Sequence, residues 1–323
     1  MFSYRIFLKQ AWSITKKYRH LWFFGIFASL TAIGGEYQLI TQGFNAQPGG
    51  HFVDNGFFTL YNLFNPTFYS SLGQLASANP AAFWSLISVV VLAILLVLVM
   101  LYLAITSQAA LVEQSARIML SKRKKEDLSI NEGIVFGRLH FWPVLGLNLA
   151  NSFIISACLL IISLPLVFLF VTDSAAIALT YSVLFIIFVP ISLAIALIMK
   201  YAIAAQVLES KSFIASIEKA WKIFHKNWLV SLEMAILLFL INFIVGLGTL
   251  IVLSLFLVPL LLLSLQLYAP LLMALSFILI IAGMLIVASI LNTFQISAWT
   301  SLYLHLQQKR GISKLERFFK RNR

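Results

Sequence analysis

The chain has 323 residues, of which 61% are hydrophobic and only 11% are charged. Soluble domains carry about a quarter charged residues, so this composition excludes an ordinary soluble protein and indicates a membrane protein. The net charge of +12 does not indicate nucleic acid, because the basic residues gather between long apolar runs, and the single Cys158 excludes an intramolecular disulfide.

The 23 Lys and Arg residues fall into four patches, within residues 5–19, 117–138, 200–226 and 309–323. Lys and Arg beside a span resist translocation and stay in the cytoplasm. Placing all four patches inside requires an even number of crossings between them, and each gap has the apolar length for two. The sequence therefore predicts an all-α integral membrane protein of six spans in three hairpins, with both termini cytoplasmic.

Residues 1–20 have the pattern of an amphipathic helix on the inner membrane surface. The residues expected to face lipid are Phe2, Ile6, Phe7, Ile14 and Tyr18. A first span of about residues 21–34 follows and is short for a crossing. A cleaved signal peptide is the competing interpretation, which the long polar lead and the missing small-residue cleavage site disfavour.

Residues 35–82 are predicted to form the one long loop, on the extracytoplasmic side. The second span begins near Phe83 and is expected to continue as a helix past Thr106 into the cytoplasm. Ser129 and Glu132 have capping-box spacing, which predicts a helix start.

Spans three and four, about 141–171 and 175–207, are separated by so few residues that they must be antiparallel neighbours. Pro165 and Pro190 are the expected kink sites. Residues 211–228 form the next predicted surface helix, with an apolar stripe of Phe213, Ile217, Ala220, Phe224 and Trp228. Span five then reaches about residue 259, span six covers about 270–306, and residues 307–323 are a basic cytoplasmic tail.

A short pattern recurs before the outgoing spans. Ala11-Trp12 and Ala220-Trp221 each begin an Ala-Trp-x-Ile unit, and a weaker third unit covers 133–142. Each unit predicts an interfacial helix that anchors the following hairpin at headgroup level, before spans 1, 3 and 5. The predicted anchors are Trp12, Lys16, Lys17, Arg19, Trp22, Arg138, Trp142, Lys219, Trp221, Lys222, Lys226 and Trp228.

Four stretches, LWFFGIFA, GRLHFWPVLGLNL, SIEKAWKIFHKNWL and FQISAWTSLYLHLQ, together resemble a broad group of bacterial six-span proteins. This group includes the membrane domain attached to some glycerophosphodiester phosphodiesterases. The resemblance implies a bacterial cytoplasmic membrane and a role near lipids. It carries no catalytic residues, because the phosphodiesterase chemistry belongs to a separate soluble domain.

Catalytic patterns are missing from the sequence. The 11 acidic residues are scattered, and no metalloprotease, hydrolase, phosphate-loop or dinucleotide motif occurs. His20, His140 and His225 recur at corresponding positions of the three units, but interfacial histidines explain them better than a metal site, because no carboxylate is paired with them. We therefore expect no enzyme activity, no cofactor and no metal, and an enzyme that works at the inner headgroup plane is the least favoured hypothesis.

Ionisable residues within a span are costly, which makes Glu233 the leading candidate for an intramembrane function. Its position near the inner interface, where a carboxylate reaches Lys or water, favours a structural ion pair over a transport role. The side-chain amides of Asn242, Asn292 and Gln295 join helices by default or line a polar pathway. Gly246 and Gly248, followed by a proline, either break span five as in transporters or pack closely.

The favoured hypothesis is one transmembrane domain over residues 1–323 that acts as a non-enzymatic scaffold or accessory protein in the cytoplasmic (plasma) membrane. Its expected partners are the lipid bilayer, anionic lipid headgroups and a membrane protein, and not nucleic acid. The alternative is a small transporter or channel for a lipid or hydrophobic solute, which requires Glu233 and the buried amides to line one cavity.

Overall fold

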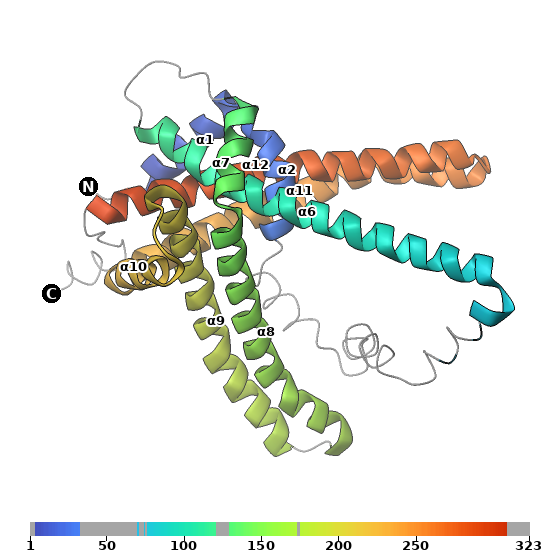
Figure 1. Cartoon of the computed structure of the whole chain (residues 1–323), viewed down its shortest axis with the longest axis horizontal. Coiled ribbons are helices and arrows are strands. Elements are labelled where there is room, and N and C mark those ends of the chain that lie inside the picture. Colours follow the sequence, from blue (N-terminus) through green and yellow to red (C-terminus); the bar gives the residue numbers. More distant parts are fainter. Residues whose placement is uncertain are drawn as a thin grey trace. The chain divides into compact units, whose positions relative to one another are not determined.

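The computed structural model describes residues 4–32, 70, 74, 76–120, 129–172 and 175–308, and every regular element within them is an α-helix (Figure 1). The helices are α1 (Tyr4–Lys17), α2 (Leu21–Ala32), α6 (Pro80–Leu120), α7 (Ile130–Leu139), α8 (Phe141–Thr172), α9 (Ala175–Glu209), α10 (Phe213–Lys226), α11 (Trp228–Gln266) and α12 (Pro270–Gln308). Most of the predicted loop over 35–82, and the basic tail beyond residue 308, lie outside this description.

Five of the described helices, α6, α8, α9, α11 and α12, are long and apolar enough to cross a membrane. The helical fold and its membrane character are therefore as predicted. The predicted first span, about residues 21–34, is not among these five helices. Its helix α2 has 12 residues and is about 18 Å long at 1.5 Å per residue, which is shorter than a hydrocarbon core of about 30 Å. The six-span arrangement in three hairpins stays a prediction.

Several helix limits agree with the sequence patterns. α6 is one continuous helix of 41 residues through Thr106, about 60 Å long, or twice the thickness of a hydrocarbon core. The predicted helix start is confirmed, since Ser129 is the N-cap of α7 and its Oγ accepts a hydrogen bond of 3.2 Å from the Glu132 backbone N–H. α9 continues through Pro190, one of the two expected kink sites.

Residue contacts divide the chain into two compact units. The first contains residues 1–33, 103–154 and 193–323, and the second contains 34–102 and 155–192. Helices α6, α8 and α9 each contribute residues to both units, so the expected single domain stays a prediction. The functional candidates discussed below all belong to the first unit.

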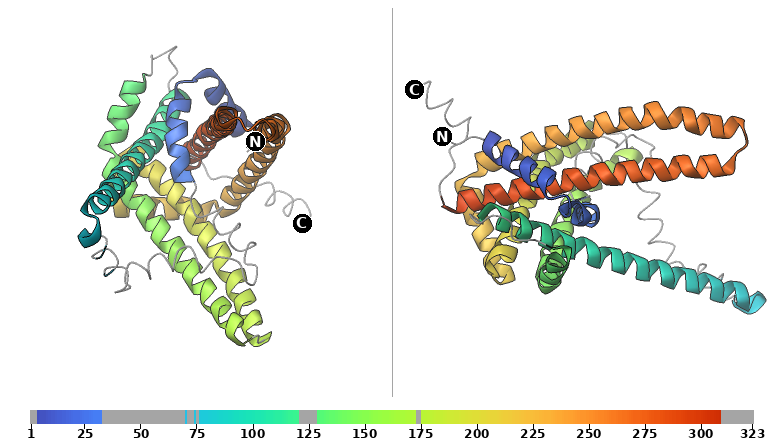
Figure 2. Two further views of the ribbon diagram at one scale, coloured as in Figure 1. Left: turned by 90° about the vertical axis from the view of Figure 1, so that its right-hand side faces the viewer. Right: turned by 90° about the horizontal axis from the view of Figure 1, so that it is seen from above.

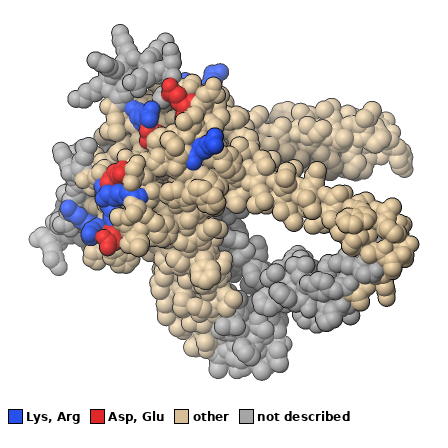
Figure 3. Space-filling view, in the orientation of Figure 1, with Lys and Arg blue, Asp and Glu red and all other residues tan. Residues whose placement is uncertain are grey.

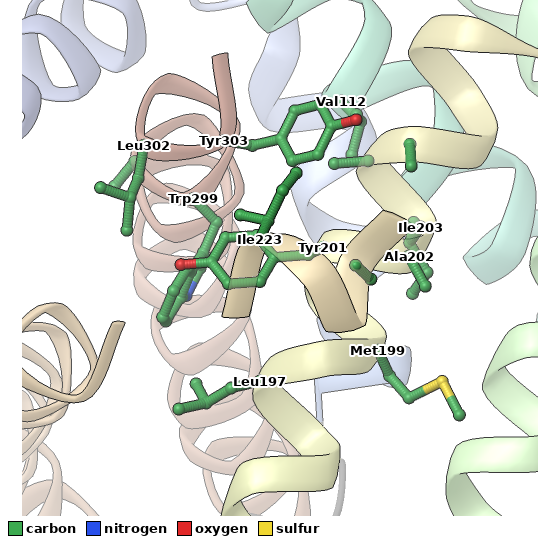
Figure 4. Close-up of a cluster of buried hydrophobic side chains, with 14 of the residues drawn as sticks. Val112, Leu197, Met199, Tyr201, Ala202, Ile203, Ile223, Trp299, Leu302 and Tyr303 are labelled. Atoms are coloured by element: carbon green, nitrogen blue, oxygen red, sulfur yellow. The ribbon is translucent and has the colours of Figure 1, made fainter. Parts of the chain in front are cut away.

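The hairpin of α11 and α12 is the framework of the first unit. Its two helices run side by side (Figures 1 and 2), and both α1 and α2 pack against α12. A hydrophobic core forms where the C-terminal part of α9 meets this hairpin, and Tyr201, Trp299 and Tyr303 lie within it (Figure 4). Tyr201 and Ser231 share a hydrogen bond of 2.8 Å inside this core.

The contact between α2 and α12 is close and polar. A Cβ atom on Gly25 would lie 2.4 Å from the backbone oxygen of Ser289 and 2.4 Å from Thr293 Oγ1, so only glycine fits. Thr293 Oγ1 also donates to the backbone oxygen of Leu21 at 3.3 Å. Small residues and hydroxyl groups are what helices use to associate within lipid, where apolar side chains have no preference for protein over bilayer.

The face predicted for α1 differs from the one observed. In α1, Phe7 and Ile14 are buried against protein, whereas Ile6 is 60% exposed. The prediction that Phe7 and Ile14 face lipid was therefore wrong, because they hold α1 against the protein core. In the apolar stripe predicted for residues 211–228, Ala220 is buried and Ile217 and Phe224 pack against the same core, while Phe213 and Trp228 are exposed.

Span five is also unlike the broken helix of a transporter. α11 is continuous from Trp228 to Gln266 and includes Pro259. A Cβ atom on Gly246 or Gly248 would meet nothing within 4 Å. Neither a helix break nor close packing against the described residues explains these glycines.

Candidate functional site

Four of the predicted tryptophan anchors are exposed, on α1, on α10 and at the starts of α8 and α11. Trp12 is 54% exposed, and Trp142, Trp221 and Trp228 are 76%, 57% and 52% exposed. The indole of Trp22 behaves differently, because its Nε1–H donates to the backbone oxygen of Thr15 at 2.9 Å and so connects α2 with α1. Four of the five predicted tryptophan anchors thus have the exposure that contact with headgroups requires.

Most of the predicted basic anchors are exposed as well. These are Lys16, Lys17, Arg19, Arg138, Lys222 and Lys226. Figure 3 shows Lys and Arg near one end of the α11–α12 hairpin, while the remainder of the hairpin carries no charged side chain in this view. Charge and apolar surface are therefore separated along the first unit, as in a protein that spans the boundary between water and lipid.

Lys219 is the exception, because it belongs to a polar cluster that the sequence did not reveal. Its ammonium donates to the Oε1 atom of Glu209, which also accepts from Tyr303 Oη at 2.5 Å and from Gln307 Nε2 at 3.0 Å. Lys211 Nζ lies 3.4 Å from the other carboxylate oxygen. We call these five residues the Glu209 cluster. They join the end of α9, the middle of α10 and the end of α12 around one carboxylate.

The candidate Glu233 accepts a hydrogen bond from the phenol of Tyr4, a buried residue of α1. The carboxylate thus helps to hold α1 on α11. Asn292 is buried, and its amide donates to the backbone oxygen of Gly25 at 3.4 Å. Asn242 and Gln295 are half-buried on α11 and α12. The structure gives Glu233 and Asn292 contacts between helices, and for Asn292 this is the default role expected of the side-chain amides.

Two surface grooves accompany these helices. The larger one, which we call the α1 groove, has a volume of about 530 Å³ and is lined by Tyr4, Arg5, Leu8, Lys9, Trp12, Leu237 and Phe294. The smaller one, of about 390 Å³, lies on α10 and is lined by Ile214, Ile217, Glu218, Trp221 and Lys222. None of the four candidate intramembrane residues lines either groove, so neither groove is the polar cavity that the transporter hypothesis requires.

The three histidines of the repeat contact aromatic rings. His140 stacks on Phe136 with the ring centres 4.3 Å apart, and His225 lies parallel to Trp221 at 6.4 Å. His20 meets Tyr18 edge to face, and burial lowers the pKa of its imidazole below the ordinary value of 6.5. Within the described part of the chain, no group of three His, Cys, Asp or Glu residues is placed to hold a metal ion.

The five long apolar helices give the chain the character of a multi-pass helical membrane protein. The chain significantly matches no family model, no curated protein and no solved structure.

Proposed function

We propose that the protein is a non-enzymatic scaffold or accessory protein of the cytoplasmic membrane, with both termini in the cytoplasm. Its basic surface helices hold anionic lipid headgroups or a membrane-protein partner. The orientation rests on the four basic patches of the sequence, and the membrane on the apolar helices together with the family resemblance.

The observation that carries the proposal is the two-sided character of α10. Ala220 is fully buried and Ile223 is 8% exposed, so one face of the helix is fixed in the protein. The opposite face presents the exposed indole of Trp221 beside Lys222 and Lys226. An exposed tryptophan next to lysines is the arrangement that inserts a ring among headgroups while the ammonium groups contact phosphate.

Binding of a fluorescent phosphatidylglycerol to the purified full chain in neutral detergent tests the proposal. Each Lys near an anionic membrane surface contributes about 1 kcal/mol. Lys222→Gln with Lys226→Gln should therefore raise the dissociation constant by roughly 10- to 30-fold. The matched control, Lys222→Arg with Lys226→Arg, keeps both charges and should bind like the wild type.

Two results would overturn the scaffold proposal. One is equal affinity for phosphatidylglycerol in the wild type and the glutamine variant. The other is solute flux across proteoliposomes that is lost specifically in Glu233→Gln, because such flux identifies a transporter that uses the one carboxylate inside the α11 apolar run.

A further inference from the structure

The α1 groove combines a cationic edge with an apolar floor. Tyr4, Leu8 and Trp12 follow one another at intervals of four residues, so they form one row along α1, and Arg5 and Lys9 form the neighbouring row. The opposite wall comes from Leu237 of α11 and Phe294 of α12. Figure 2 shows α1 lying along this hairpin. Both rows of α1 and both helices of the hairpin thus contribute to one open groove.

Arg5 and Lys9, the two basic residues of the groove, are available to bind an anionic ligand. Arg5 and Lys9 are exposed, and within the described part of the chain neither forms an ion pair with a carboxylate. Lys219, in contrast, is paired with Glu209. Glu233 lies close in the fold but does not line the groove, and its carboxylate accepts the Tyr4 hydrogen bond. Arg and Lys four residues apart on one helix are suited to bind one phosphate group together.

The floor of the groove is suited to a hydrocarbon chain. The rings of Trp12 and Phe294 meet edge to face with their centres 6.2 Å apart, and Leu8 and Leu237 complete the apolar lining. Leu237 and Phe294 belong to α11 and α12, which are apolar enough to cross a membrane. A lipid of the surrounding bilayer therefore reaches the groove sideways, without passing through water.

We propose that the α1 groove binds one anionic phospholipid, with the phosphate between Arg5 and Lys9 and an acyl chain along Trp12, Leu237 and Phe294. This inference rests on the proposed function, because it assigns a defined site to the contact with anionic lipid. Charge complementarity selects an anionic headgroup, and the apolar floor selects a lipid over free phosphate.

The first experiment compares removal of the two groove charges with a variant that keeps them. Arg5→Gln with Lys9→Gln should raise the dissociation constant for phosphatidylglycerol by roughly thirtyfold in the full chain in neutral detergent. Arg5→Lys with Lys9→Arg keeps both charges at the groove, and should change the dissociation constant by less than about threefold. Equal affinity in the wild type and the glutamine variant would overturn the site.

The second experiment detects the bound acyl chain through tryptophan fluorescence of the wild-type protein. Phosphatidylglycerol with a brominated chain should quench a component of the tryptophan fluorescence that is missing in Trp12→Phe. Brominated phosphatidylcholine should not, and inorganic phosphate should not displace the anionic lipid. Quenching that is the same in the wild type and in Trp12→Phe, displacement by phosphate alone, or preferential binding of an amphipathic acidic peptide would each overturn the proposal.

The two proposals fail separately. If neutralising Lys222 and Lys226 weakens lipid binding while neutralising Arg5 and Lys9 does not, the scaffold proposal stands and the α1 groove is not a site. If the Arg5 and Lys9 variant does not fold, as judged by helix content and a monodisperse elution profile, the quenching of Trp12 in the wild type decides the question.

Discussion

Removal of the Glu209 carboxylate should destabilise the protein much more than removal of an exposed acid from the same region. Glu209 accepts hydrogen bonds from Lys219, Tyr303 and Gln307, forms an ion pair with Lys211, and has a side chain that is only 21% exposed. Hydrogen bonds to charged groups contribute about 1.5–3 kcal/mol each. Partial exposure and non-additivity reduce the sum. We expect Glu209→Ala to lower the free energy of unfolding by about 3 kcal/mol, and Glu209→Gln by about half as much.

The matched control is Glu218→Ala on α10. The Glu218 side chain is 67% exposed and lies 3.9 Å from Lys222, so its loss should cost less than about 0.5 kcal/mol. Reversible unfolding by sodium dodecyl sulfate in mixed micelles, followed by circular dichroism, measures both variants. A double-mutant cycle with Tyr303→Phe should give a coupling energy of about 1 kcal/mol or more. The reasoning is refuted if Glu209→Ala is no more destabilising than Glu218→Ala.

Two further predictions use the same unfolding measurement. Gly25→Ala places a methyl group 2.4 Å from two oxygen atoms of α12 and should lower the free energy of unfolding by about 1–3 kcal/mol. In the control Gly246→Ala the methyl group meets no atom within 4 Å, so this variant should be neutral or more stable by up to about 1 kcal/mol. Equal effects of the two substitutions would contradict the close contact of α2 with α12. His20 has a lowered pKa in the folded chain, so the unfolded chain takes up the proton first, and the wild type should lose stability as the pH falls below about 6.5. His20→Gln should flatten this dependence, and an unchanged pH profile would count against it.

Local patterns in the sequence were enough to predict many of the helix limits. The helix start at Ser129 was predicted from two residues three positions apart, and the structure has the N-cap hydrogen bond between Ser129 and Glu132. The Glu209 cluster was not predictable in this way, because Tyr303 lies 94 residues from Glu209 and Gln307 lies 98 residues away. Glu209 lies at the end of an apolar run near Lys211, and this position was the one feature of the sequence that indicated an ion pair there.

The buried face of a membrane helix is harder to predict than its limits. Ile6 and Phe7 are neighbours of similar apolarity, but Ile6 is 60% exposed and Phe7 is 6% exposed. In water an amphipathic pattern distinguishes the protein side from the solvent side. Within lipid both sides accept apolar residues, so hydrophobicity alone does not assign Phe7 to the protein and Ile6 to the outside.

The Ala-Trp-x-Ile repeat does distinguish the two sides, through residue size and not through hydrophobicity. Ala11 and Ala220 are both fully buried, and the isoleucines three residues later, Ile14 and Ile223, are 4% and 8% exposed. Trp12 and Trp221 are 54% and 57% exposed. A small residue permits the helix to approach the core closely, and the adjacent tryptophan then has to point away, because it lies about 100° around the helix from the alanine. The same four-residue pattern therefore fixes one face of α1 and of α10 in the protein and presents an indole beside basic side chains. That outer face is the surface from which both the proposed lipid contact of α10 and the α1 groove are built.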